Sequence, residues 1–179
     1  MTHPSRTSLV SKMHEGEFVV SVQLDPPFTT ENKPIEQALQ KLRDVIGKLK
    51  GAGVELVDIN SSRGKRKRIC IDSLLLAAEC RRCGIEVIPH VRARDFSELE
   101  LLKAITGAYA VGGVNDFLII TGDPHDKDEG FPSESIDKID SLKALVCLNA
   151  FLTCRQSVAL ATAVNQNDPL NEVSRLREK

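Results

Sequence analysis

The sequence has almost no net charge, no long apolar run and no broad basic or acidic bias. Its 24 Lys and Arg residues nearly balance 25 Asp and Glu residues, which leaves a net charge of -1. A near-neutral chain creates no wide field that would attract nucleic acid or an anionic membrane. No apolar stretch approaches the roughly 20 residues that span a bilayer. We therefore expect neither a nucleic-acid partner nor a membrane partner.

Residues 1–16 lack the continuous apolar segment of a secretory signal and are expected to form an N-terminal extension. The five cysteines are an odd number and lie mostly among helix-forming residues, which is typical of a reduced, cytoplasmic protein. Cys80 and Cys83 form one CxxC pair without a second pair. We expect this pair to belong to a helix and not to a redox or zinc site.

Common catalytic and phosphate-binding signatures are missing too. Neither GxGxxG nor GxxxxGK[ST] occurs, and there is no nucleophile elbow. These absences argue against a dinucleotide fold of the Rossmann type and against an acyl hydrolase. No convincing set of metal ligands surrounds His90, so no metal site is expected.

What the chain does contain is an alternation of short β-branched runs with longer helical segments. Expected strands cover 18–24, 54–60, 85–91, 114–122 and 157–164, and expected helices cover 35–53, 70–84, 97–113, 135–154 and 168–179. Five β-α units predict an α/β fold with a parallel sheet and right-handed crossovers. Two architectures fit this order: a doubly wound open sheet, or part of a (β/α)8 TIM barrel.

Polar residues gather at the carboxyl end of each expected strand. They are Gln23 and Asp25, Asn60 to Ser62, His90 and Arg92, Thr121 to Asp123, and Asn165 to Asp168. Because the loops at the carboxyl ends of parallel strands converge, this placement predicts one composite ligand site.

Three features allow two interpretations each. Asp123, between Gly122 and Pro124, could accept hydrogen bonds from a ring or a ribose, or could simply belong to a turn. His90 could line the site or be a half-buried imidazole. Residues 63–68 carry five cations in six positions, which could hold phosphates or form a solvated loop.

The succession VSVQLDPP, VELVDIN, GIEVIPHVRARD and GAYAVGGVNDFLIITGDP resembles the methylenetetrahydrofolate reductases. It is most similar to the branch that is fused to homocysteine methyltransferase modules. The resemblance runs from about Ser8 to the last residue. It implies that residues 17–179 form about five β-α units of a (β/α)8 barrel that carries FAD. Such an enzyme reduces 5,10-methylenetetrahydrofolate to 5-methyltetrahydrofolate with electrons from a nicotinamide cofactor or another donor.

The resemblance also assigns residues to the flavin. It implies flavin contacts for His90, Thr121, Gly122 and Asp123, and Asp123 also takes a catalytic position. Thr121 stands where many relatives have Arg, and Asn60 where Thr often lies beside the cofactor. Positions near the ribityl and phosphate groups match Asn165, Glu172 and Lys179.

Gln23 departs from the family pattern, because the family has Glu three residues before the first Pro of the Pro-Pro pair. That Glu acts as the general acid that opens the methylene bridge to an iminium. A carboxamide has no such proton at neutral pH, and general acid catalysis is typically worth about 10²–10⁴-fold. Asp25 shares the strand face, but relatives carry both the Glu and this Asp.

The match also ends three β-α units before a barrel would close. We therefore expect either a piece of a longer product or a second chain, a further copy or a partner subunit, that supplies the missing face. Three functions remain open: a reductase with impaired acid catalysis, a degenerate flavin- or folate-binding module, and an unrelated barrel that binds phosphate through residues 63–68.

Overall fold

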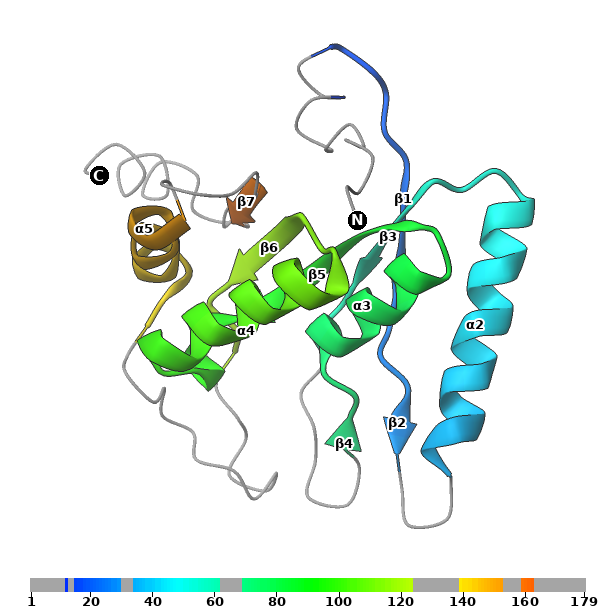
Figure 1. Cartoon of the computed structure of the whole chain (residues 1–179), viewed down its shortest axis with the longest axis horizontal. Helices are drawn as coiled ribbons and strands as arrows, with labels where there is room; N and C mark the ends of the chain where they lie inside the picture. The colour runs from blue at the N-terminus through cyan, green and yellow to red at the C-terminus, as the bar shows by residue number, and fades with distance from the viewer. Residues whose placement is uncertain are drawn as a thin grey trace.

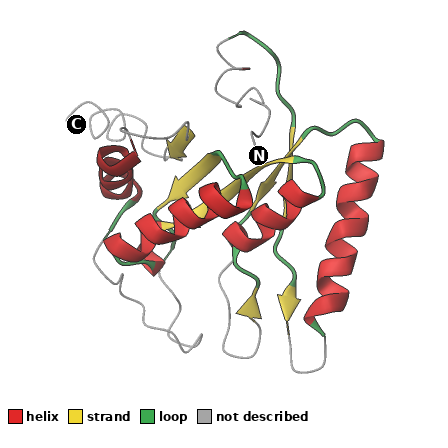
Figure 2. Cartoon of the chain, in the orientation of Figure 1, coloured by secondary structure: helices red, strands yellow, loops and turns green. Residues whose placement is uncertain are grey.

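The computed structural model of this 179-residue chain describes residues 12, 15–29, 34–61, 69–123, 139–152 and 159–162. Strands and helices alternate along it (Figures 1 and 2). In chain order they are β1 (Ser21–Leu24), β2 (Phe28–Thr29), α2 (Ile35–Gly51), β3 (Leu56–Ile59), β4 (Ile69–Cys70), α3 (Ser73–Arg82), β5 (Glu86–Arg92), the 3₁₀ turn η1 (Ala93–Asp95), α4 (Glu98–Gly112), β6 (Asp116–Ile120), α5 (Ser141–Leu152) and β7 (Ala159–Thr162).

The main sheet is parallel, and its five strands lie in the order β1-β3-β5-β6-β7. Spatial order follows sequence order, so each crossover moves one strand further in the same direction. A doubly wound sheet instead reverses direction at a switch point. Across these five strands the fold is therefore singly wound, as consecutive strands of a (β/α)8 barrel are. The expected α/β fold with a parallel sheet is confirmed.

Helices α3 and α4 lie in front of the sheet in Figure 1 and cover one of its faces. The core forms between the helices and the sheet, because alternate residues of each strand point to the helices. Its largest fully buried side chains include Ile46, Ile59, Leu76, Ile105 and Phe117. None of the described helices combines the length and the apolarity that crossing a membrane requires.

Local sequence signals explain where the helices begin and end. Helix α3 starts after Asp72, whose carboxylate accepts hydrogen bonds from the backbone N–H groups of Leu74 and Leu75 at 2.9 and 3.2 Å. Helix α4 starts after Ser97 and ends at Gly113, which has a left-handed φ of 66°.

Several predicted boundaries were wrong. The helix expected from residue 135, for example, begins at Ser141, after the non-helical Ile139 and Asp140. The helix expected from residue 70 begins at Ser73, because Cys70 instead pairs with Phe28 in the small antiparallel β2-β4 sheet. The strand expected from residue 18 begins at Ser21, because the neighbouring β3 begins at Leu56, the register partner of Ser21. Phe18 is consequently 94% exposed. The expected helix 168–179 lies outside the described residues.

Candidate functional site

Four polar side chains come together on the face of the sheet that faces away from the core. Ser21 and Gln23 alternate with Val22 and Leu24 on β1, and Gln23 is the register partner of Asp58 on β3. His90 on β5 alternates with Val91, which packs in the core. Because side chains alternate along a strand, Ser21, Gln23, Asp58 and His90 share this open face.

His90 and Asp58 form the best-defined contact on this face. The imidazole Nε2 of His90 lies 3.3 Å from Oδ1 of Asp58, and the hydroxyl of Ser21 donates to Oδ2 of Asp58 at 2.8 Å. Ser73, the first residue of α3, donates its hydroxyl to the carbonyl of His90 at 2.7 Å. Asp58 thus holds the imidazole of His90, and Ser73 at the start of α3 holds its backbone.

Burial lowers the pKa of His90, and the charge and hydrogen bond of Asp58 raise it, with burial prevailing. A neutral imidazole that donates Nε2–H to Asp58 keeps Nδ1 as its acceptor atom. The Ser21 hydroxyl gives its proton to Asp58 and not to His90. These three residues are thus not a nucleophile with its general base.

The ends of β1 and β3 are also tied together. The amide Nδ2 of Asn60 donates to Oδ1 of Asp25 at 3.1 Å, and the backbone N–H of Asn60 donates to the carbonyl of Leu24 at 3.0 Å. Asp25 lies two residues after Gln23 on the same side of the chain. Gln23 therefore has a carboxylate beside it on β3 and another just after the end of β1.

The segment after β6 is held by two arginines from the end of β5 and from η1. Its three consecutive carbonyls all accept hydrogen bonds. Thr121 accepts from the backbone N–H of Arg94 at 3.3 Å, Gly122 from Nη1 of Arg94 at 3.1 Å, and Asp123 from Nη2 of Arg92 at 2.8 Å. With these carbonyls engaged, residues 121–123 present the Asp123 carboxylate, which is exposed, at the edge of the sheet.

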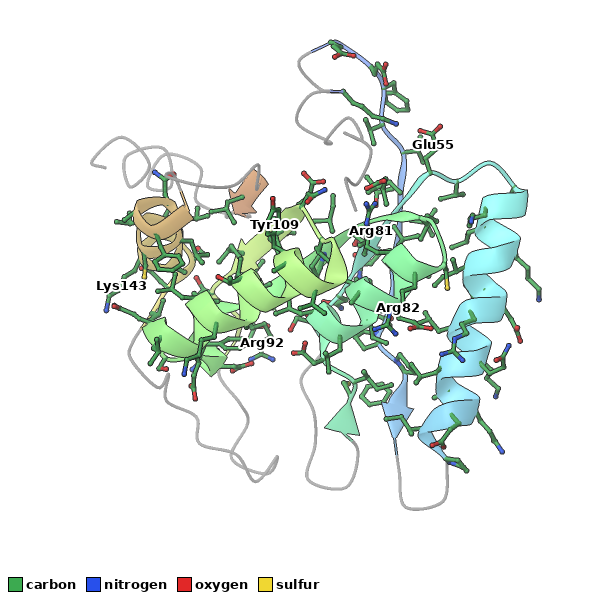
Figure 3. All side chains as sticks on the ribbon, viewed as in Figure 1. Glu55, Arg81, Arg82, Arg92, Tyr109 and Lys143 are labelled. Carbon is green, nitrogen blue, oxygen red and sulfur yellow. The ribbon has the colours of Figure 1, made fainter. Side chains whose placement is uncertain are left out.

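Arg92 is only 3% exposed, and its Nε lies 3.2 Å from Oδ2 of Asp95. Figure 3 shows Arg92 at the carboxyl edge of the sheet, whereas Glu55 and Arg81 lie at the opposite edge. A buried arginine thus holds the segment after β6 at the carboxyl edge of the sheet.

Gly122 and Thr121 have structural roles at this edge. Gly122 has a φ of 82°, and a Cβ there would lie 2.7 Å from Nε of Arg92. The hydroxyl of Thr121 accepts from the backbone N–H of Ser141 at 3.1 Å and so caps the start of α5. Both positions therefore shape the backbone on which a ligand would rest.

The structure places Gln23 on β1, Asn60 directly after β3 and His90 on β5, three neighbouring strands, and residues 121–123 directly after β6. Asn165, Glu172, Lys179 and the basic run 63–68 lie outside the described residues. Sequence reasoning missed Asp58 and Arg94. The sequence did offer a signal for Asp58, because it is a charged residue within the apolar strand run VELVDIN.

A pocket of about 390 Å³ lies at the opposite, amino edge of the sheet, between residues 17–20, 52–56, Glu86 and Asp116. Its acidic residues are partly paired: Glu55 contacts Lys12 at 2.8 Å, and Glu86 contacts Arg81. Singly wound β/α folds bind ligands at the carboxyl ends of their strands. We therefore assign the candidate site to the carboxyl edge and not to this pocket.

The CxxC pair lies on α3. Cys80 is fully buried, and burial raises the pKa of its thiol to about 12, which makes the thiolate inaccessible at neutral pH. Within the described residues, no three His, Cys, Asp or Glu side chains cluster in a way that could hold a metal ion.

No protein-family profile and no curated protein matches the chain. Among solved structures, it is similar to a probable tagatose 6 phosphate kinase from Sinorhizobium meliloti 1021, with 12% identity and a TM-score of 0.46 over 80% of this chain and 41% of that one. It is also similar to 7,8-dihydropteroate synthase from Vibrio fischeri ES114, with 13% identity and a TM-score of 0.37 over 89% of this chain and 70% of that one. The chain thus spans less than half the length of the kinase. Both TM-scores are below 0.5, so neither likeness bears on function.

Proposed function

We propose that this chain is a flavin-dependent oxidoreductase domain of one-carbon metabolism that resembles methylenetetrahydrofolate reductase and binds FAD and folate at the carboxyl edge of its sheet. One observation carries the proposal. Five parallel strands in sequential order present Gln23, Asn60, His90 and residues 121–123 at one edge. Those are the positions that the sequence resemblance assigns to the flavin and to the catalytic acid.

The residues at this edge fit a flavin. The exposed Asp123 carboxylate can accept hydrogen bonds from ring N–H groups. His90 on β5 and Asn60, directly after β3, supply further polar groups. When bound, FAD would supply the hydride chemistry, and the chain would orient the ring and exclude water.

The first test is the visible absorption spectrum of the purified chain, followed by titration with FAD. We expect flavin bands or saturable uptake. Asp123→Asn should weaken FAD binding, because it removes the charge that accepts from the ring. Asp44→Asn, an exposed position on α2, is the matched control and should leave binding unchanged. A colourless chain that takes up no FAD would refute the proposal.

The role of Gln23 is tested by restoring an acid. Gln23→Glu should raise turnover of 5,10-methylenetetrahydrofolate by about 10²-fold or more, since a carboxylic acid can protonate the leaving nitrogen. Asp58 and Asp25 beside it would raise the pKa of the new carboxyl group and favour its acidic form. Gln37→Glu on α2 is the control. An unchanged rate would show that Gln23 does not limit the reaction.

A second candidate is a module that binds flavin or folate and completes a partner, either a second copy or another subunit. Gln23 at the acid position favours it. So does the sheet, because β1 and β7 each have one strand neighbour within its described part. The two functions differ in turnover. An enzyme oxidises a nicotinamide or other donor through the flavin, whereas a module binds FAD without oxidising the donor.

A further inference from the structure

The open face of the sheet holds a titratable group close to Gln23 that the resemblance assigns only to flavin contact. Gln23 and Asp58 are register partners on β1 and β3, and Asp58 binds His90 on β5. We propose that His90, held by Asp58, is the proton donor that remains in this site, a less effective one than the carboxylic acid that Gln23 cannot provide. This inference rests on the proposed function.

The geometry suits a proton donor because the imidazole is fixed and still reaches the open face. The side chains of His90 and Asp58 are 14% and 19% exposed. Ser21 donates to one carboxylate oxygen of Asp58, which leaves the other for Nε2 of His90. In the imidazolium form Nε2–H faces Asp58, so Nδ1–H is the proton that a substrate can take.

The charges around His90 favour this role. From β3, Asp58 stabilises the imidazolium. On its own strand, Arg92 is engaged with the Asp123 carbonyl and with Asp95. On β6, Leu118 is the register partner of His90, and from α3 the Ser73 hydroxyl donates to the carbonyl of His90.

The register brings two further polar residues near His90. Asn60 directly follows β3, whose last residue, Ile59, is the register partner of Pro89, and its amide donates to Asp25, which directly follows β1. Asp116 is two residues before Leu118, on the same face of β6 and further from the carboxyl edge. Asp58 is therefore the acidic residue in direct contact with the imidazole.

The proposed step conserves atoms and charge. The proton on Nδ1 of His90 moves to the bridging amine nitrogen of 5,10-methylenetetrahydrofolate as the bond between that nitrogen and the methylene carbon breaks. The electron pair of this bond stays on the nitrogen. The methylene carbon becomes an iminium with the second nitrogen, ready to accept hydride. His90 is left neutral and regains its proton from water.

The test is the pH dependence of turnover in the FAD-loaded chain, in the wild type, Asp58→Asn and His90→Gln. Because burial holds the pKa of His90 below its ordinary 6.5, wild-type turnover should rise as the pH falls through and below that value. Asp58→Asn should move the inflection to lower pH, since it removes the charge that favours the imidazolium. His90→Gln should lower turnover by on the order of 10²-fold and abolish the inflection. His3→Gln controls for the loss of a histidine.

Each other outcome identifies what failed. A His90→Gln variant that binds FAD and keeps the wild-type pH profile overturns the proton-donor role and leaves the proposed function standing. If His90→Gln does not fold, the Asp58→Asn variant decides instead. An inflection of its pH profile at the wild-type position overturns the proton-donor role. A wild-type chain that binds FAD without turnover at any pH also contradicts the donor role and favours the partner module. A wild-type chain that takes up no FAD overturns both proposals.

Discussion

At the scale of single residues, the candidate site depends on a glycine and two arginines more than on the residues that would do chemistry. Arg92 and Arg94 engage all three carbonyls of residues 121–123. Gly122 permits this, because its φ of 82° and the nearby Arg92 leave no room for a side chain. The position of the Asp123 carboxylate is thus set by backbone contacts made around it.

Gly122→Ala should therefore destabilise the chain by about 1–3 kcal/mol and weaken FAD binding, because it combines a strained φ with a clash against Arg92. The control is Gly47→Ala in α2, where a Cβ meets nothing within 4 Å. That change should stabilise the chain by about 0.5–1 kcal/mol. Urea unfolding and FAD titration measure both effects, and equal behaviour of the two variants would contradict the clash.

At the scale of elements, helix starts position the site. The cap of α3 at Asp72 precedes Ser73, whose hydroxyl binds the carbonyl of His90. The start of α5 is tied to Thr121, directly after β6, whose hydroxyl accepts from the Ser141 N–H, while Asp140 accepts from the Lys143 N–H. Each of these helices is therefore anchored at the carboxyl edge by a residue next to the site, so helix stability and site geometry are coupled.

Asp72→Ala should cost about 0.5–2 kcal/mol of stability, because it leaves the N–H groups of Leu74 and Leu75 without their acceptor. Asp72→Asn should restore most of this loss, since Asn is a comparable N-cap. Thermal and urea unfolding measure the difference. If Asp72→Asn were as unstable as Asp72→Ala, the role of the cap would be refuted.

At the scale of the whole molecule, one core joins the helices to one face of the sheet. Phe117 on β6 is 1% exposed and belongs to this core together with Ile46 of α2 and Leu148 of α5. Elements far apart in the sequence thus share one packed interior, and loss of packing at its centre affects all of them.

Phe117→Ala should cost about 3–5 kcal/mol, the range for deleting a buried aromatic ring. Val111→Ala is the control at an exposed apolar position, 88% exposed, and should change stability by less than about 0.5 kcal/mol. Circular dichroism during urea unfolding compares the two. A small cost for Phe117→Ala would show that β6 does not pack as described.

The sequence by itself determined the type and order of the elements, because β-branched alternation, helical spacing and Gly or Pro stops act over a few residues. It also placed polar residues at the strand ends, since these follow directly from the strand positions. His90, Asn60 and Asp123 were found in this way. The exact starts of β1 and α3 were missed, because they depend on the register with β3 and on the pairing of Cys70 with Phe28.

Only the tertiary structure decided the winding of the sheet, the partner of His90 and the contacts that hold residues 121–123. These depend on which strands lie side by side and in what register. Asp58 and His90 are 32 positions apart in the sequence, and Arg92 and Asp123 are 31 apart, so no local pattern encodes their contacts. Packing of the helices on one face sets the register and thereby brings these groups together.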